Sequence, residues 1–337
     1  MNARQKTITF VICVVLISIS FISLSQGKYK IDLNIIANWF CNKLGFVAKG
    51  LFSQQQDLIL SNVRLPRIIL VSLVGSSLAI SGAVLQSVFK NPLVSPFILG
   101  ISAGASFGVS LIIVFLQSYN LILLQSSAFA FGIFAVLSVL LISKLFSSNN
   151  TIILVLSGVI ISAFFTSLVS LLQYFSDEQK LQSILFWTFG SFNNSSWENV
   201  ATVSPINLIC STILISQSWK INVLSLGEQE SQVLGINANK FRIMLIGITA
   251  LLTSSITAVC GPIGWVGLLI PHIVRLIGGA NNFYVLINSF LLGAAFLQVV
   301  DLIARNLAPV EIPVGIVTAI IGLPFFIYIL YKSKSSY

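Results

Sequence analysis

Charged side chains are scarce in this protein. Asp, Glu, Lys and Arg together make up 8% of its 337 residues, against about one quarter in a typical soluble domain. Hydrophobic residues account for 56% of the chain, and the mean hydropathy is +0.98. The polar breaks between the apolar runs are too short to hold a soluble domain. This composition predicts a chain that is solvated mainly by lipid.

The chain also has little material for catalysis or metal binding. Nine acidic residues and one histidine are too few for most hydrolytic or metal sites. There is no Gly-x-x-x-x-Gly-Lys-Ser/Thr phosphate loop, so any ATP hydrolysis must occur on another polypeptide. The four cysteines have no Cys-x-x-Cys spacing and are interpreted as small hydrophobic residues: Cys13, Cys41, Cys210 and Cys260. We therefore expect no catalytic residue, metal site or cofactor in this chain.

Carboxylates are missing from the middle of the predicted membrane spans. All nine acidic residues fall in predicted loops or near span ends: Asp32, Asp57, Asp177, Glu178, Glu198, Glu228, Glu230, Asp301 and Glu311. Ion-coupled secondary carriers usually hold an ionisable group near the bilayer midplane. The pattern argues against such a carrier, which is kept as the alternative function. The net charge of +9 is spread over both predicted faces, which argues against nucleic-acid binding.

Apolar runs of about 20 residues, the length that crosses a hydrocarbon core as a helix, recur along the chain. We predict an all-α polytopic membrane protein with a single transmembrane domain over residues 1–337. The ten predicted spans are 7–25, 64–86, 94–116, 121–145, 151–174, 197–218, 241–260, 263–278, 284–303 and 313–332. A secretory signal is the alternative for the first span. A retained anchor is favoured, because the apolar run is long and lacks an Ala-x-Ala cleavage site.

Basic residues predict the orientation of the chain, because they concentrate in cytoplasmic loops. Arg4 and Lys6 precede the first span, and Lys332 and Lys334 lie at the end of the tenth. With an even number of spans, both termini are then cytoplasmic and residues 26–60 form an external loop. Basic residues also occur in predicted external segments, so the charge bias is modest.

The longest predicted internal loop, residues 219–240, is polar and amphipathic. Its glycines permit turns between short helices. Its apolar residues can contact a cytoplasmic partner: Leu224, Leu226, Val233, Leu234 and Ile236. A solvated connector is the alternative interpretation of this loop.

Two blocks of the sequence have a distinctive order and spacing. The first contains Arg64-Leu65-Pro66-Arg67, Gly82, Gln86, Asn91-Pro92-Leu93-Val94-Ser95-Pro96 and Leu99-Gly100. The second contains Gly261-Pro262-Ile263-Gly264-Trp265-Val266-Gly267-Leu268, Pro271-His272, Arg275, Asp301, Arg305, Glu311-Ile312-Pro313-Val314-Gly315 and Gly322-Leu323-Pro324. Over nearly the whole chain, these blocks resemble the iron-siderophore, haem and cobalamin permease family of ABC importers. The sequence departs from the family pattern at Lys90, Ser231 and Ala280-Asn281-Asn282.

The resemblance implies a cobalamin-permease-like fold of ten transmembrane helices with short cytoplasmic coupling helices. It implies the permease subunit of a binding-protein-dependent importer in the bacterial inner membrane, paired with a second copy or a paralogue around the substrate path. Two ATP-binding subunits, which hold ATP and Mg, would lie below, and a periplasmic or lipid-anchored binding protein above. The cargo would be an iron chelate (siderophore or haem), cobalamin, or a metal oxyanion such as molybdate.

Three arginines at predicted external span ends are candidate docking residues for the binding protein: Arg64, Arg67 and Arg305. The planar guanidinium pairs bidentately with carboxylates, and in the family arginines at these positions meet glutamates of the binding protein. The alternatives are interfacial snorkelling, a helix cap, or an i, i+4 brace between Asp301 and Arg305.

The resemblance assigns ATPase coupling to the loop at 219–240, with five residues nearest the family pattern: Gly227, Glu228, Ser231, Leu234 and Gly235. In the fifth predicted span, Ser162, Thr166, Ser170 and Gln173 follow Gly158 at helical spacing and form a polar stripe. The stripe is predicted to line the translocation path, and close helix packing is its alternative. Residues 183–192 are expected to form a short external helix near the gate. Pro271, His272 and Arg275 are interpreted as shaping a helix end.

Overall fold

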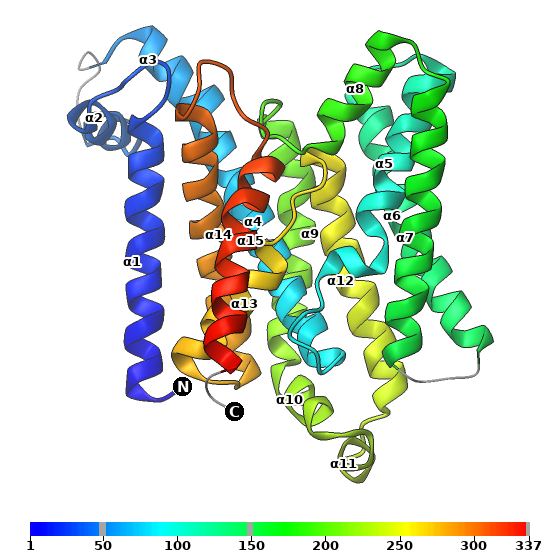
Figure 1. Cartoon of the computed structure of the whole chain (residues 1–337). Coiled ribbons are helices and arrows are strands. Elements are labelled where there is room, and N and C mark those ends of the chain that lie inside the picture. Colours follow the sequence, from blue (N-terminus) through cyan, green and yellow to red (C-terminus); the bar gives the residue numbers. More distant parts are fainter. Residues whose placement is uncertain (47–51, 147–150, 335–337) are drawn as a thin grey trace.

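The computed structural model describes residues 1–46, 52–146 and 151–334, with the backbone alone for 328–334. These residues form helices and no strand (Figure 1). Seven segments of the described chain are long and apolar enough to cross a membrane: α1 (Ala3–Ser25), the helical stretch Gln54–Val88 that ends in α4 (Leu65–Val88), α6 (Leu121–Leu145), α7 (Thr151–Tyr174), α9 (Trp197–Ser216), α12 (Ala238–Cys260) and α14 (Asn282–Asn306). Three shorter apolar segments are α5 (Ile101–Leu111) with the π-helix η3 (Ile112–Leu116), α13 (Val266–Gly278) and α15 (Val314–Lys334).

Each of the ten predicted spans overlaps one of these ten apolar segments, and the predicted all-α fold class is confirmed. The remaining short helices are α2 (Leu33–Lys43), α3 (Gln54–Leu58), η1 (Ile59–Arg64), η2 (Pro96–Leu99), α8 (Glu178–Thr188), α10 (Ser218–Leu226) and α11 (Glu228–Val233). The predicted external loop 26–60 thus carries α2, α3 and the first two residues of η1, while its residues 47–51 lie outside the described part of the chain.

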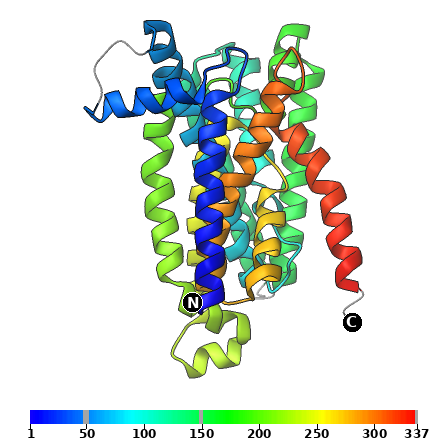
Figure 2. The same ribbon diagram turned by 90° about the vertical axis from the view of Figure 1, so that its left-hand side faces the viewer.

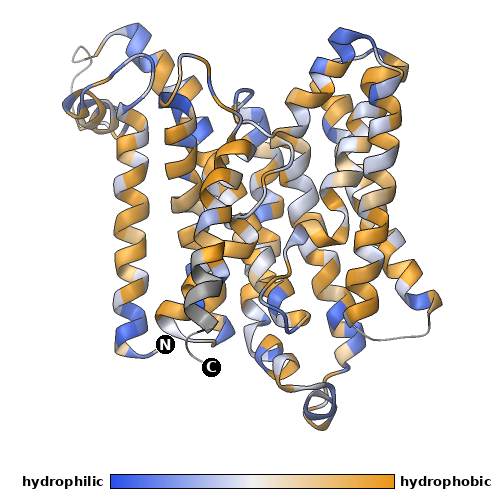
Figure 3. Ribbon diagram, viewed as in Figure 1, coloured by the Kyte–Doolittle hydropathy of each residue, from blue (hydrophilic) through white to orange (hydrophobic). Residues whose placement is uncertain are grey.

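The molecule has two distinct ends. Both termini lie at one end, and α10 and α11 project from it, whereas α2, α3 and α8 lie at the other (Figures 1 and 2). We call these the termini end and the opposite end. Hydrophobic residues dominate the middle of the bundle and hydrophilic ones gather at both ends (Figure 3). This distribution is the one required of a helix bundle that crosses a membrane.

Helix α4 is the centre of the bundle, since most of its side chains are buried. It packs against α14, α13, α12 and α9. Glycines permit the closest approaches: a Cβ added at Gly75 would lie 2.3 Å from the Gly293 carbonyl oxygen, and one at Gly82 only 1.8 Å from that of Gly267. Membrane helices use small residues in this way, because lipid provides no hydrophobic force that drives helices together.

The short helix after α7 lies earlier in the chain than expected. Sequence patterns predicted it at 183–192, and α8 spans Glu178–Thr188. Asp177 starts the helix, because its Oδ1 accepts a hydrogen bond from the Lys180 N–H at 2.9 Å. That bond and the Lys180 ammonium hold the pKa of the exposed Asp177 carboxyl below its ordinary value. Gly190, with φ +69°, marks the turn that follows the helix.

Candidate functional site

A cluster of ionic side chains joins three segments at the opposite end of the bundle. Arg67, near the start of α4, donates hydrogen bonds to Asp301 Oδ1 of α14 from Nε at 3.1 Å and from Nη2 at 2.9 Å. Its Nη2 also lies 2.9 Å from Glu311 Oε2, in the connection between α14 and α15. Asp301 is 1% exposed. A buried carboxylate of this kind is stable only when it is paired.

Two further arginines complete this ionic cluster. Arg305 Nε lies 3.0 Å from Asp301 Oδ2, and its Nη2 donates to Ser23 Oγ of α1 at 2.6 Å. Arg64 donates to two backbone carbonyl oxygens, those of Leu24 and Tyr29. The cluster therefore holds three cations against two carboxylates, an excess of one positive charge.

The structure brings together the three predicted docking residues, Arg64, Arg67 and Arg305, and buries each of them. The brace between Asp301 and Arg305, which sequence analysis offered as the alternative role, is present. All three guanidinium groups are occupied within the chain, and their role in docking stays a prediction.

The predicted coupling loop forms two short helices that project from the termini end, α10 and α11 (Figure 2). Ser231 is fully buried, and its Oγ donates to the Gly227 carbonyl at 2.5 Å. Glu228 pairs with Arg242 of α12 at 2.7 Å. Gly235 turns the chain towards α12 with φ +75°, a conformation that favours glycine. The residues of the predicted pattern therefore shape a compact projection.

The tip of this projection is apolar and exposed. Leu226, Val233 and Leu234 have exposed fractions of 68%, 86% and 51%. The glycines and Ser231 shape the loop, and the three apolar side chains are left free for contact. An apolar tip on a polar loop is typical of a surface that is buried by a protein partner.

Sequence analysis missed a chain of hydrogen bonds that connects the loop to the membrane helices. Asn222 Oδ1 of α10 accepts from both the backbone N–H and Nδ2 of Asn282, at 2.8 and 2.9 Å. Ser87 Oγ of α4 donates to Asn282 Oδ1 at 2.8 Å. Neither asparagine stands in a recognisable motif, so no pattern in the sequence indicated this contact. These bonds connect α10 to the start of α14 and to the end of α4.

Only part of the polar stripe of α7 lines a cavity. Ser162 and Thr166 line a cavity of about 320 Å³ together with Phe97, Ser102, Ala103, Ser106, Val169 and Thr188. Ser170 and Gln173 are not among the residues that line it. Gly158, at the head of the stripe, packs against the Ile98 carbonyl, where an added Cβ would lie 1.9 Å from the oxygen. The cavity has hydroxyl groups and no charged side chain.

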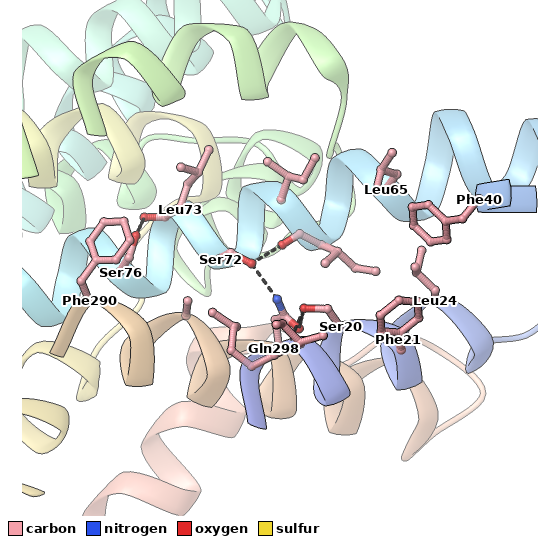
Figure 4. A pocket seen from close by; sticks show the side chains of 15 residues that line it. Ser20, Phe21, Leu24, Phe40, Leu65, Ser72, Leu73, Ser76, Phe290 and Gln298 are labelled. Atoms are coloured by element: carbon pink, nitrogen blue, oxygen red, sulfur yellow. Dashed lines mark hydrogen bonds between the residues drawn. The ribbon is translucent and has the colours of Figure 1, made fainter. Parts of the chain in front are cut away.

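A second cavity, of about 440 Å³, lies between α1, α4 and α14 and is almost entirely apolar (Figure 4). Three polar side chains meet in it: Gln298 Nε2 donates to Ser72 Oγ at 2.7 Å, and Ser20 Oγ donates to Gln298 Oε1 at 3.0 Å. These bonds connect α1 to the two central helices. The residues described contain no cluster of three or more His, Cys, Asp or Glu side chains that would hold a metal ion.

The chain is similar to known importer permeases along its whole length. The model of the FecCD transport family matches residues 14–332. The molybdate import system permease protein MolB of Haemophilus influenzae is 41% identical over 97% of this chain and 96% of its own length. The Fe(3+)-citrate import system permease protein YfmD of Bacillus subtilis is 36% identical over 99% of this chain and 97% of its own length.

A solved structure shares the fold. It is described as an inward-facing conformation of an ABC transporter assigned to the metal-chelate type, and it has 40% sequence identity and a TM-score of 0.86. The match covers 97% of this chain and 99% of that one. The ten apolar segments of the fold and these similarities agree: the chain belongs to the FecCD transport family and is the permease subunit of an ABC importer.

Proposed function

We propose that this permease imports a metal oxyanion of the molybdate class. The observation that carries the proposal is the similarity to a molybdate permease over 97% of this chain. The hydroxyl-lined cavity beside α7 is compatible with such a cargo, because Ser and Thr side chains hydrogen-bond an oxyanion without holding it tightly. A ferric chelate is the second candidate, favoured by the similarity to a ferric citrate permease over 99% of the chain.

The proposed assembly follows the chemistry of the two ends. A second permease copy shares the substrate path, and two ATP-binding subunits cover the termini end, which is cytoplasmic in a bacterial inner membrane. ATP and Mg are bound by those subunits, and a binding protein delivers cargo to the opposite end. The exposed apolar tip at Leu226, Val233 and Leu234 supports the position of the ATP-binding subunits.

Coupling is proposed to be a rigid-body movement. When the ATP-binding subunits close on ATP, they push the α10–α11 projection, and the Asn222–Asn282–Ser87 bonds transmit that movement to α14 and α4. The projection contains the five residues of the predicted pattern: Gly227, Glu228, Ser231, Leu234 and Gly235. In this proposal the chain acts mechanically, and ATP hydrolysis takes place on the ATP-binding subunits.

Docking is proposed to draw on the excess positive charge of the ionic cluster. Among the described residues, the hydrogen-bond partners of Arg64 are backbone carbonyl oxygens, so an acidic side chain of the binding protein would supply a counter-charge. Arg67 and Arg305 would contribute to docking through the positive electrostatic potential of the same cluster. An Arg64→Met variant tests this role: the affinity for the binding protein should fall, while the unfolding temperature of the same sample separates lost docking from lost folding.

The cargo is tested by ATP hydrolysis in lipid vesicles that contain this chain and its ATP-binding subunit. The binding protein is added with molybdate, ferric citrate or sulfate, which has the charge and shape of molybdate but no metal. Stimulation by molybdate alone is the expected result. If only ferric citrate stimulates hydrolysis, the cargo is the ferric chelate and not the oxyanion. If neither compound stimulates it, both proposed cargoes are wrong.

A further inference from the structure

A polar cavity of about 260 Å³ at the termini end has no role in the cycle described above. It lies where α4 and α13 end and α14 begins, and α10 borders it. Among the described residues, the side chains that line it include two cations and no carboxylate: Gln86, Ser87, Lys90, Asn91, Pro92, Ser225, Arg275, Ala280 and Asn282.

The first cation, Arg275, is held in place by neutral hydrogen-bond acceptors. Its Nη1 donates to Gln86 Oε1, and its Nη2 donates to the Ala83 carbonyl at 3.1 Å and to Ser87 Oγ at 3.3 Å. These bonds use three of the five N–H groups of a guanidinium. Within the described chain, no carboxylate oxygen lies within 4.0 Å of it, so the remaining donors have no anionic partner.

The second cation, Lys90, follows α4 directly. It is exposed, and in the described residues it makes no ion pair. The start of α14, a helix of 25 residues, lies at the same cavity through Asn282. The positive end of that helix dipole adds to the field of the two side chains. All three features favour negative charge in the cavity.

We infer that this cavity binds a small inorganic oxyanion between Lys90 and Arg275. The guanidinium fork supplies directional hydrogen bonds, and the ammonium group supplies a mobile point charge. Ser225 of α10 lines the same cavity, so a bound anion contacts the coupling loop and the membrane helices together. Occupancy would hold α10 in the observed position and oppose its movement.

Two sources would supply such an anion on the cytoplasmic side: phosphate released by ATP hydrolysis, or the oxyanion cargo after import. Only this choice rests on the proposed function, because binding to the purified chain needs neither cargo transport nor orientation. A site for phosphate would slow the cycle when hydrolysis products accumulate. A site for the cargo would slow it when enough has been imported.

The test is a titration of the purified full chain in detergent with sodium phosphate and with sodium molybdate, against sodium chloride at equal ionic strength. Lys90→Gln removes one cation of the cavity. Lys144→Gln removes an exposed cation at the same end, on α6, and is the matched control. Saturable binding is expected in the parent and in Lys144→Gln, and binding about tenfold weaker in Lys90→Gln, since one charge-assisted contact is lost.

The tighter of the two anions identifies the source. Absence of saturable binding by either anion, or equal weakening in both variants, would overturn the site. Hydrogen exchange of residues 218–226 is measured in the same samples. Slower exchange with the anion, lost in Lys90→Gln, supports the contact with α10; binding without slower exchange would overturn that contact.

Discussion

Arg67 makes the ionic contacts that connect the segments at the opposite end of the bundle. Its guanidinium holds Asp301 from α14 and Glu311 from the connection to α15, so one side chain joins three segments. Burial makes these contacts consequential, because removing one partner of a buried ion pair leaves an uncompensated charge. The same cation at an exposed position would contribute little.

Replacing Arg67 with methionine tests this role. We expect the free energy of unfolding to fall by about 3 kcal/mol or more, the range found when a buried pair loses one partner. Glu311→Gln is the control, because the Glu311 side chain is 26% exposed and water can replace its contact; its cost should be about 1 kcal/mol or less. Thermal unfolding in detergent measures the stability of both variants. Equal losses of stability would show that the buried ion pairs of Arg67 do not stabilise the fold more than an exposed contact does.

The arginines also show what sequence reasoning reached at this scale. The positions of Arg64, Arg67 and Arg305 at one end follow from counting spans. The buried contacts of Arg64 and Arg305 do not, because their partners Leu24, Tyr29 and Ser23 are brought to the site by α1 and the chain after it, from far away in the sequence. Of the alternatives offered from the sequence, the i, i+4 brace of Asp301 and Arg305 is present, and it could be expected because both residues lie on one face of the same helix.

Between elements, the crossing of α4 over α13 is set by two glycines. Gly82→Ala places a methyl group 1.8 Å from the Gly267 carbonyl oxygen, where the backbone cannot yield easily. We expect the free energy of unfolding to fall by about 1 to 3 kcal/mol, the usual cost of overpacking.

Gly247→Ala is the matched control, since a Cβ at Gly247 of α12 meets nothing within 4 Å. There alanine should be neutral or stabilising by up to about 1 kcal/mol, because glycine is the poorer helix former. Unfolding midpoints of the two variants decide between these expectations. Similar midpoints would mean that α4 and α13 can separate without cost.

The projection of α10 and α11 is expected to bind the ATP-binding subunit through its exposed apolar side chains. Asp substitution of both Val233 and Leu234 should weaken binding to the ATP-binding subunit by at least tenfold, about 1.4 kcal/mol, because two exposed apolar contacts are lost. Gln229→Asp with Gln232→Asp adds the same charge to exposed positions of the same helix and should change binding less. Co-purification from detergent measures both, and equal losses would point to charge instead of apolar contact.

At the scale of the whole molecule, the path is expected to form between two copies of the chain. In a background free of the four cysteines, Thr166→Cys should cross-link two permeases through a bifunctional thiol reagent, because Thr166 is exposed and lines the cavity. Ser167→Cys, one residue further on α7 and turned about 100° away, is also exposed and should cross-link less. Gel electrophoresis separates the products, and equal cross-linking would mean that the stripe does not face the partner copy.

The sequence by itself determined the positions of the ten apolar segments, the all-α class and the family. Each depends on local composition, hydrophobic length or ordered motifs, which are properties of the chain before it folds. The coupling loop was predicted for the same reason, since a polar segment between two apolar runs is visible along the chain. The short helix α8 was misplaced because its start depends on one capping side chain, Asp177, in a segment without strong periodicity.

Only the tertiary structure decided which side chains meet. The ionic cluster joins residues 234 and 244 positions apart, and the Asn222–Asn282 contact spans 60 positions. The cavity between Lys90 and Arg275 likewise exists only where α4, α10, α13 and α14 come together. The physical reason is that polar groups in a membrane protein must find partners inside the fold, and helix packing alone sets which partners are within reach.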